Sequence, residues 1–254
     1  MKRIVTPGRV SVITAVYNAA PTLEQCLLSV QNQSYTEIEH IVIDGGSTDG
    51  SVEVLQRHSS LLAYWVSEPD SGVFDAWNKG LSRATGEWIA FLGADDVLFP
   101  DALSQYLAVC GGTDAQYVCS RVRWTRPGLP DKIIGRPWSW PAFQRKMTTA
   151  HVGSLHRFDL FEKYGNYDTS YKIVGDYELL LRPGKDLNSL FMGEVTVTMP
   201  AGGNSDRFPA LTEARLAKIR TGGRNRIWAL WELWVESLKL AVRCVEAVCA
   251  SFLL

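Results

Sequence analysis

The chain of 254 residues is long enough for one large domain, or for one domain with an appendage, and its net charge of −1 carries no general signature of nucleic-acid binding. Its cysteines are odd in number and form no CxxC pair, which argues against a disulfide framework and a zinc site and favours a cytosolic compartment. The basic N-terminus precedes an apolar run that is short and broken by Thr14, so we expect a first strand there and not a signal peptide.

Apolar strands and helical patterns alternate through the first 110 residues. Strands are predicted at 10–16, 39–44, 63–67 and 88–92, and helices at 21–33, 51–59, 72–84 and 100–110. This alternation is typical of βαβ units, which place parallel strands in a sheet with helices on its faces. Because no period of roughly 20–50 residues repeats, a solenoid is excluded.

The pattern becomes less regular after residue 110. We expect a strand at 117–123, a long loop at 124–146, helices at 158–164 and 176–181, a strand at 190–198, a flexible loop at 202–205, and helix from 211 to the end. We therefore divide the chain into a main α/β domain, residues 1–212, and a helical tail, residues 213–254.

Carboxylates follow several of the predicted strands. Asp44 ends the second strand, Asp70 follows the third, and the pair Asp95 and Asp96 follows the fourth directly. Ligands of open α/β sheets bind beyond the carboxyl ends of the strands. Adjacent carboxylates raise each other's pKa, and a divalent cation carrying phosphate oxygens would relieve that cost. In the alternative interpretation Asp96 caps the next helix, Asp95 is solvated, and Asp44 is a turn residue before two glycines.

Other phosphate-binding elements are missing from the sequence. No GxGxxG follows the first strand, and the P-loop pattern GxxxxGK[ST] does not occur. The first strand ends in TAVYN without an acid, which argues against an aspartyl-phosphate mechanism. With these alternatives excluded, the carboxylates at the strand ends favour a site that holds a nucleotide by hydroxyl contacts and a metal.

Three stretches in order, VSVITAVYNAAPTLEQCLLSVQNQ, IVIDGGSTDGS and EPDSGVFDAWNKGLSRATGEWIAFLGADD, resemble the successive motifs of family 2 glycosyltransferases. The resemblance covers residues 10–110 almost continuously and continues more weakly through HVGSLHR (151–157) and VGDYELLLR (174–182). It implies the GT-A fold, an α/β architecture with a Rossmann-like, mainly parallel central sheet flanked by helices. It also implies an inverting transfer of a sugar from a nucleotide donor to an acceptor hydroxyl.

The resemblance also implies roles for matching residues. The implied nucleotide-site residues are Thr14, Tyr17 and Asn18 at the base, Asp44 at the base or ribose, and Asp70, Asn78, Lys79 and Asp95 near the ribose and phosphates. Asp95 and Asp96 match the metal motif, with Asp96 as the direct ligand of Mn²⁺ or Mg²⁺. Many members carry Asn or Asp where this chain has Gly93, so only the pair can serve. Without the resemblance, Asp70 reads as a charge at a helix N-terminus and Lys79 as solvated.

Asp176 matches the family's catalytic aspartate and is expected to be the general base. It could also act as the N-cap of the following helix, and the two roles are compatible. His151 and Glu178 are assigned to the acceptor side, with a surface or supporting position as the alternative for Glu178. His156 is expected to be structural.

The tail combines a basic run with an amphipathic helix. The charged residues Glu232, Glu236, Lys239, Arg243 and Glu246 recur at helical spacing and form one stripe, and the remainder is rich in Trp, Leu, Val and Ala. No charge-free run approaches the ~20 residues of a membrane-spanning helix. We expect the helix to lie in a membrane interface. In the alternative interpretation its apolar face packs on the domain or on a second subunit.

These observations predict a metal-dependent, inverting glycosyltransferase on the cytoplasmic face of the cell membrane. We expect it to add one sugar to a glycan or lipid-linked glycan in envelope polysaccharide synthesis, with a UDP-sugar as donor and with GDP and dTDP left open. No nucleic-acid partner is expected, and a homo-oligomer remains an option. The alternative is a catalytically silent scaffold subunit, against which the retention of Asp44, Asp95, Asp96 and Asp176 argues. A nucleotidyltransferase is a weaker alternative, because the Gly-rich basic loop after the first strand is missing.

Overall fold

The structure is a computed structural model that describes residues 4–126, 128–203 and 207–251, with residues 242–251 described by their backbone. The strands are β1 (Thr6–Val16), β2 (Ile38–Asp44), β3 (Tyr64–Ser67), β4 (Gly86–Gly93), β5 (Val97–Leu98), β6 (Tyr117–Arg126), β7 (Leu129–Ile134), β8 (Ser154–Arg157) and β9 (Ser189–Pro200). The helices are α1 (Ala20–Gln31), α2 (Ser51–Arg57), α3 (Val73–Arg83), α4 (Ala102–Cys110), α5 (Trp140–Phe143), α6 (Phe158–Tyr164), α7 (Gly175–Leu181), α8 (Phe208–Arg220) and α9 (Arg226–Ser251).

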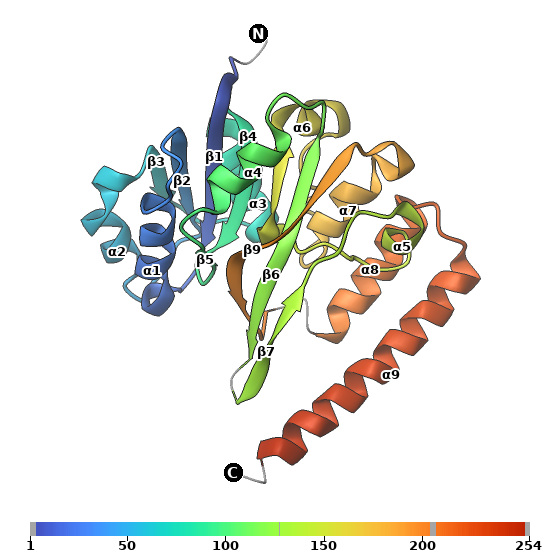
Figure 1. The fold of residues 1–254 in the computed structure, drawn as a ribbon. Helices are drawn as coiled ribbons and strands as arrows, with labels where there is room; N and C mark the ends of the chain where they lie inside the picture. The colour runs from blue at the N-terminus through green and yellow to red at the C-terminus, as the bar shows by residue number, and fades with distance from the viewer. Residues whose placement is uncertain (1–3, 127, 204–206, 252–254) are drawn as a thin grey trace.

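All of these strands belong to one sheet, in the order β3-β2-β1-β4-β8-β6-β9-β5, with β7 paired to β6 (Figure 1). The first four are parallel, as the βαβ pattern predicts. The second half is mixed, because β8 runs antiparallel to both β4 and β6 while β9 runs parallel to β6. In the register of β1 with β2, Val16 lies opposite Asp44, so both strands end at the same edge.

Helices cover both faces of the sheet. Alternate residues of β1 point to opposite sides, as a strand requires. Ile13 packs in a core with Phe74 and Trp77 of α3, and α6 and α7 contribute to the same core. Val12 faces the other side, in a core that contains Cys26 of α1 and residues of α4. Because both faces are buried, β1 reads as a continuous apolar run.

The predicted long loop at 124–146 contains more structure than expected. It includes β7, which forms a hairpin with β6, and the short helix α5. Exposed residues and Pro130 hide the strand character of β7, which pairs only with β6 among the described strands. The four-residue strand β8 was also not predicted, although it joins the two halves of the sheet.

The predicted tail begins inside a helix that belongs to the core. Ala210 and Ala217 of α8 are buried in the same core as α7. The helix α9 then packs against α8 and runs along the outside of the molecule (Figure 1). In the described part of the chain, no helix has both the length and the apolar character that crossing a membrane requires.

Three of the cysteines have described side chains, and none of these three forms a disulfide. Cys26, Cys110 and Cys119 are buried free thiols. Cys244 and Cys249 lie outside the described side chains. Residues 204 and 205 of the predicted flexible loop likewise lie outside the described residues.

Candidate active site

The Asp44 carboxylate holds the loop after β2 in place through hydrogen bonds. Its carboxylate is fully buried and accepts hydrogen bonds from the backbone N–H groups of Gly46 and Ser47, at 3.1 and 2.9 Å, and from the hydroxyls of Ser47 and Ser67. All four donors come from the protein itself. In this structure Asp44 therefore shapes the loop, which is the turn role that the sequence left open.

Asp70 lies beside this loop. A Cβ atom added at Gly45 would come within 2.6 Å of an Asp70 carboxylate oxygen, so the two strand ends approach each other closely. The other oxygen accepts the N–H of Gly72 at 2.8 Å, just before α3 begins. Asp44 and Asp70 are thus brought together at the predicted edge, as carboxylates that organise adjacent loops.

Of the three residues predicted to lie at the base, two are at an open surface and one is not. Tyr17 is 67% exposed, and Asn18, in the left-handed region with φ 48°, accepts the N–H of Thr48 at 2.9 Å. Thr14 is fully buried and its hydroxyl lies 2.9 Å from Nε2 of His40. The structure places Thr14 inside the fold, where its side chain does not line an open cavity.

Asn78 and Lys79 are held by the protein. The Asn78 side-chain amide donates to the backbone carbonyl of Tyr167 at 2.9 Å and accepts from its N–H at 3.0 Å, which ties α3 to the segment before α7. The Lys79 ammonium lies 2.9 Å from Glu68 and 3.0 Å from the carbonyl of Pro69. The hydrogen bond with Glu68 raises the pKa of Lys79. Neither residue borders the central cavity described below.

Asp95 and Asp96 are adjacent but differ sharply in environment. Asp95 is exposed, whereas Asp96 is only 3% exposed and accepts the N–H of Gly93 at 2.7 Å. Burial and, secondarily, the Asp95 charge raise the pKa of Asp96 to about 8. An added Cβ at Gly93 would lie 3.0 Å from Asp95 and 3.1 Å from Asp96, so a glycine there leaves room for both carboxylates.

This carboxylate pair fits a divalent cation. The second oxygen of Asp96 is buried and has no hydrogen-bond partner among the described residues. Burying an unpaired carboxylate oxygen costs free energy, and a bound cation would offset that cost. Within the described residues no group of three or more His, Cys, Asp or Glu could hold a metal by itself. Mg²⁺ is commonly held by one or two carboxylates together with substrate phosphates, so the pair and a bound diphosphate make a sufficient ligand set.

Asp176 stands at the start of α7, across from the strand ends. It is the second residue of the helix and not its N-cap, which is Val174. Its carboxylate accepts the N–H of Tyr177 at 2.8 Å. Burial raises the pKa of Asp176 to about 6, which keeps the group mostly ionised at neutral pH while making it a stronger base than an ordinary aspartate.

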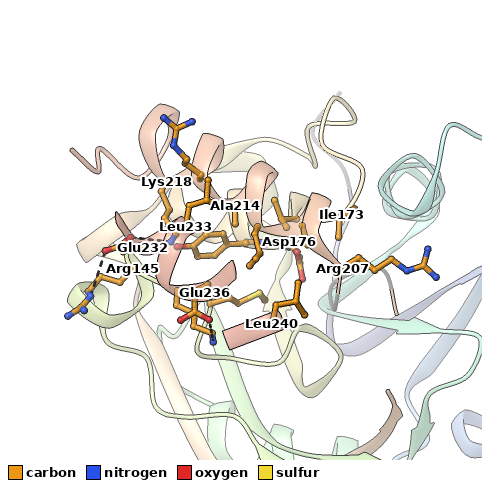
Figure 2. A pocket seen from close by; sticks show the side chains of 17 residues that line it. Arg145, Ile173, Asp176, Arg207, Ala214, Lys218, Glu232, Leu233, Glu236 and Leu240 are labelled. Carbon is orange, nitrogen blue, oxygen red and sulfur yellow. Dashed lines mark hydrogen bonds and ion pairs between the residues drawn. The ribbon is translucent and has the colours of Figure 1, made fainter. Parts of the chain in front are cut away.

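One open cavity of about 860 Å³ joins these elements. Its lining includes Tyr17, Asn18 and Asp95 from the strand ends, and His151 and Asp176 from the second half of the chain. Met147 and Ile173 also line it, and no sequence signal identified either of them. Asp176 borders a second, smaller cavity as well, which Figure 2 shows from close by.

The two residues assigned to the acceptor side lie in different places. His151 is buried, with its ring 4.9 Å from that of Trp77 and Nε2 3.0 Å from the Tyr167 hydroxyl, but it borders the large cavity. Burial lowers its pKa, so the ring is neutral. Glu178 points away from both cavities and is bound by Arg182 and by the Thr221 hydroxyl at 2.9 Å, so its assignment to the acceptor side is corrected to a supporting one.

His156 is structural, as expected. It is fully buried and its ring lies 5.5 Å from Phe91 and 5.0 Å from Tyr117. Burial lowers its pKa to about 3. The neutral ring fills the core below the site.

The same architecture occurs in solved glycosyltransferases. Staphylococcus aureus TarS 1-349 in complex with UDP-GlcNAc aligns with a TM-score of 0.66 at 15% identity, over 89% of this chain and 70% of that one. Mannosyltransferase PcManGT from Pyrobaculum calidifontis, in complex with GDP-Man and Mn²⁺, aligns with a TM-score of 0.65 at 20% identity, over 96% and 80%. The fold is therefore the GT-A fold that the resemblance implied.

Sequence comparison agrees with the fold. An uncharacterized glycosyltransferase of Mycobacterium tuberculosis is 37% identical over 177 residues, which cover 68% of each chain. A PGL/p-HBAD biosynthesis glycosyltransferase of Mycobacterium bovis is 29% identical over 184 residues, again 68% of each chain. The family model described as Glycosyl transferase family 2 matches residues 11–161, from β1 through the Asp95–Asp96 pair to β8 and α6. The chain belongs to glycosyl transferase family 2 and is a glycosyltransferase.

Proposed function

We propose that this glycosyltransferase transfers one sugar from a nucleoside diphosphate sugar, with inversion and with a divalent cation, to a hydroxyl of a glycan or lipid-linked acceptor. The observation that carries the proposal is the shared cavity of about 860 Å³, which has Asp95 on one wall and Asp176 on another. The leaving group and the base therefore have separate places in one open cavity. Such a division suits a displacement in which the hydroxyl attacks from the side opposite the leaving group.

The chemistry assigned to the chain's own residues is one proton transfer. Asp176 accepts the proton of the acceptor hydroxyl, whose oxygen forms a bond to the anomeric carbon of the donor sugar. The bond from that carbon to the diphosphate oxygen breaks, and the nucleoside diphosphate leaves with the electron pair. A base with a pKa of about 6 is well matched to this step at neutral pH.

Asp95 and Asp96 would hold the cation together with the diphosphate of the donor. When bound, a cation such as Mn²⁺ or Mg²⁺ neutralises charge that develops on the diphosphate. The orphaned oxygen of Asp96 supports this assignment, as does the Mn²⁺ complex of the structurally similar mannosyltransferase. We assign UDP as the nucleotide, supported by the UDP-GlcNAc complex of the similar TarS structure, with GDP as the competing choice.

Tyr17 and Asn18 are the proposed contacts to the base, because both are open to the cavity at the end of β1. Asp44 and Asp70 would act at the ribose by positioning the loops around it, and Asp44 could exchange one of its internal hydrogen bonds for a ribose hydroxyl. Asn78 and Lys79 support these loops from α3. This assignment keeps the predicted site but gives Asp44, Asp70, Asn78 and Lys79 indirect roles.

The helix α9 supports a membrane surface as the place of action. Its inner face is charged: Glu232 pairs with Lys218 and Arg224, and Glu236 pairs with Lys146. Its outer face is apolar and exposed, with Ile227, Leu230, Trp231, Trp234 and Leu238 all more than half exposed. A helix that turns its acids to the protein and its tryptophans to the outside is suited to an apolar environment there.

We therefore place the outer face of α9 in the interface of the cytoplasmic leaflet. Arg220 at the end of α8 and Arg226 at the beginning of α9 are exposed, and each can gain about 1 kcal/mol near anionic lipid. Tryptophan is well suited to the boundary between headgroups and acyl chains. This placement agrees with an envelope acceptor carried by a lipid.

Calorimetric titration tests the donor assignment. UDP, GDP and dTDP are titrated into the full chain with Mn²⁺, with Mg²⁺ and with EDTA, and hydrolysis of UDP-GlcNAc is followed in parallel. We expect UDP to bind tightest and only with a cation. Equal, weak binding of all three nucleotides irrespective of cation would contradict the proposal and favour a silent scaffold subunit.

A further inference from the structure

A second cavity borders Asp176 and lies between α7, α8, α9 and the segment 145–147 (Figure 2). Its volume is about 250 Å³. Aliphatic side chains form much of its wall: Val174, Ala210, Leu211, Ala214, Leu233 and Leu240. The structure thus contains an apolar chamber that opens beside the proposed base.

Some of the charged residues on this wall are paired within the protein, whereas Arg207 and Arg215 also line it and the buried Nε of Arg215 has no hydrogen-bond partner in the described part of the chain. Lys218 lies 3.1 Å from Glu232, and Lys146 lies 3.1 Å from Glu236. These pairs link α9 to α8 and to the segment after α5, and Figure 2 labels Lys218, Glu232 and Glu236 among the side chains that line the cavity. Asp176 forms no such ion pair in the described structure, so it is the acidic group that remains available to a ligand.

The two cavities share a wall. Met147, Ile173 and Asp176 line both the 250 Å³ chamber and the 860 Å³ cavity that faces the strand ends. A molecule in the small chamber can therefore contact Asp176 at the boundary with the larger cavity, where the donor is proposed to bind. A hydroxyl held at this boundary would lie next to both the base and the donor.

We infer that this chamber binds the apolar part of the acceptor and so presents the acceptor hydroxyl to Asp176; this inference rests on the proposed function. An apolar cavity of about 150 Å³ is enough for a benzene ring. The volume here suits one substituted aromatic ring or a short alkyl segment and is too small for an oligosaccharide. The occupant is accordingly an amphiphile that has a hydroxyl next to a compact apolar group.

The position of α9 supports this class of occupant. Leu233 and Leu240 on its inner side line the chamber, while Trp231 and Trp234 on its outer side are exposed. One helix therefore borders both the apolar chamber and the proposed membrane surface. An acceptor that partitions into the interface would find the chamber on the adjacent side of the same helix.

The test uses 4-butylphenol as the probe, because it combines a hydroxyl with a compact apolar body. Its dissociation constant is measured by ligand-observed NMR with the full chain. Ala214→Leu and Leu240→Trp fill the chamber from α8 and from α9, respectively. Leu216→Phe is the matched control, since it adds similar bulk to α8 at a position that is exposed and lines neither cavity.

We expect Ala214→Leu and Leu240→Trp each to weaken probe binding at least about tenfold, because the larger side chains take up the volume that the probe would fill. The control should bind the probe like the unaltered chain, and all four proteins should bind UDP with Mn²⁺ equally. In the presence of UDP and Mn²⁺, paramagnetic broadening should be stronger for the ring protons next to the hydroxyl than for the butyl methyl group. Mg²⁺ replaces Mn²⁺ as the diamagnetic reference.

The outcomes separate the two proposals. Normal probe binding in both filled variants, or stronger broadening at the butyl methyl group, overturns the acceptor chamber. So does a chain that binds UDP with Mn²⁺ but not the probe. A chain that binds no nucleotide under any condition overturns the proposed function instead.

Discussion

Lys218 of α8 and Glu232 of α9 form an ion pair that is almost completely shielded from solvent, with 3.1 Å between Nζ and Oε2. Arg224 binds the other carboxylate oxygen of Glu232. Burial lowers the pKa of Lys218, and the Glu232 carboxylate opposes that shift. The attachment of α9 to the domain thus combines a buried ion pair with apolar contacts such as that of the fully buried Ala229.

Glu232→Gln should detach α9. Removing one partner of a buried pair leaves an uncompensated charge, which costs about 3–5 kcal/mol. We expect a lower melting temperature and rapid proteolytic cleavage within α9, measured by thermal unfolding and limited trypsin digestion. Glu53→Gln, an exposed acid on α2, is the control. A variant as stable and as protease-resistant as the control would show that the pair does not hold the helix.

Asp96→Asn should remove cation-dependent nucleotide binding and keep the fold. The amide oxygen of asparagine can still accept the N–H of Gly93, so the local turn is retained. Calorimetry of UDP with Mn²⁺ should give the weak binding that the unaltered chain shows with EDTA. Asp114→Asn, at an exposed loop position, serves as the control. An unchanged affinity for UDP and Mn²⁺ in Asp96→Asn would reject Asp96 as a ligand.

Asp176→Asn should retain donor binding and lose at least about 10²-fold in transfer, the low end for a general base. In the unaltered chain, kcat/KM should fall as the pH drops through about 6, because protonation of Asp176 removes the base. The measurement is a pH–rate profile with a hydroxyl-bearing acceptor such as 4-butylphenol. A profile that is flat from pH 5 to pH 8 would remove Asp176 from the reaction.

The same substitution should stabilise the protein at neutral pH. A carboxyl group whose pKa is raised by folding weakens the fold once it ionises, so the penalty is present above the folded pKa and disappears as the pH falls below the unfolded pKa. A rise from 3.8 to about 6 corresponds to at most about 3 kcal/mol. We expect the melting temperature of Asp176→Asn to exceed that of the unaltered chain at pH 8 and to approach it near pH 4. An identical difference at both values would contradict the assigned pKa.

Replacing Trp231 and Trp234 by glutamine should abolish sedimentation with anionic vesicles. The two side chains are 55% and 58% exposed, and losing their burial in the interface forfeits about 2–3 kcal/mol, or roughly 30- to 150-fold in partitioning. The control replaces Leu129 and Ile133, which are exposed apolar residues of β7, by glutamine. Binding by the unaltered chain should also weaken with salt. A full-length dimer that ignores vesicles at low salt would instead assign the face to a second copy.

Gly175→Ala should lower kcat without changing UDP affinity. A Cβ at this position would lie 2.9 Å from ring carbons of Phe74, so α7 must move away from α3 and carry Asp176 with it. A displacement of about 1 Å can cost roughly 10²-fold in rate. Gly193→Ala, where an added Cβ meets nothing within 4 Å, is the control. Full activity in Gly175→Ala would show that the position of α7 does not limit the reaction.

The sequence predicts the N-terminal half of this molecule well because that half repeats one rule. Continuous apolar strands such as β1 and β4 carry their own signal, and the acids that follow them fall at one edge of the sheet. The second half follows no such rule. Short strands such as β8, whose histidine is buried by its neighbours, are recognisable only once β4 and β6 are in place on either side.

The site shows the same limit at the level of single residues. Motif positions identify which residues belong to the region, but not which direction their side chains take. Thr14 points into the core, and Asn78 reaches Tyr167, 89 positions away in the chain. For α9 the sequence shows a charged stripe, and only the partners Lys218, Arg224 and Lys146 reveal that the stripe faces inward.

The uninterrupted sheet has a consequence for motion. Strands β4, β8 and β6 connect the N-terminal half of the sheet to its C-terminal half through backbone hydrogen bonds. The two halves therefore cannot hinge without breaking inter-strand hydrogen bonds at the centre of the molecule. The ring of Phe74 against Gly175 and the two bonds from Asn78 to Tyr167 add a brace between α3 and α7. The separation between the strand-end carboxylates and Asp176 is therefore set when the chain folds.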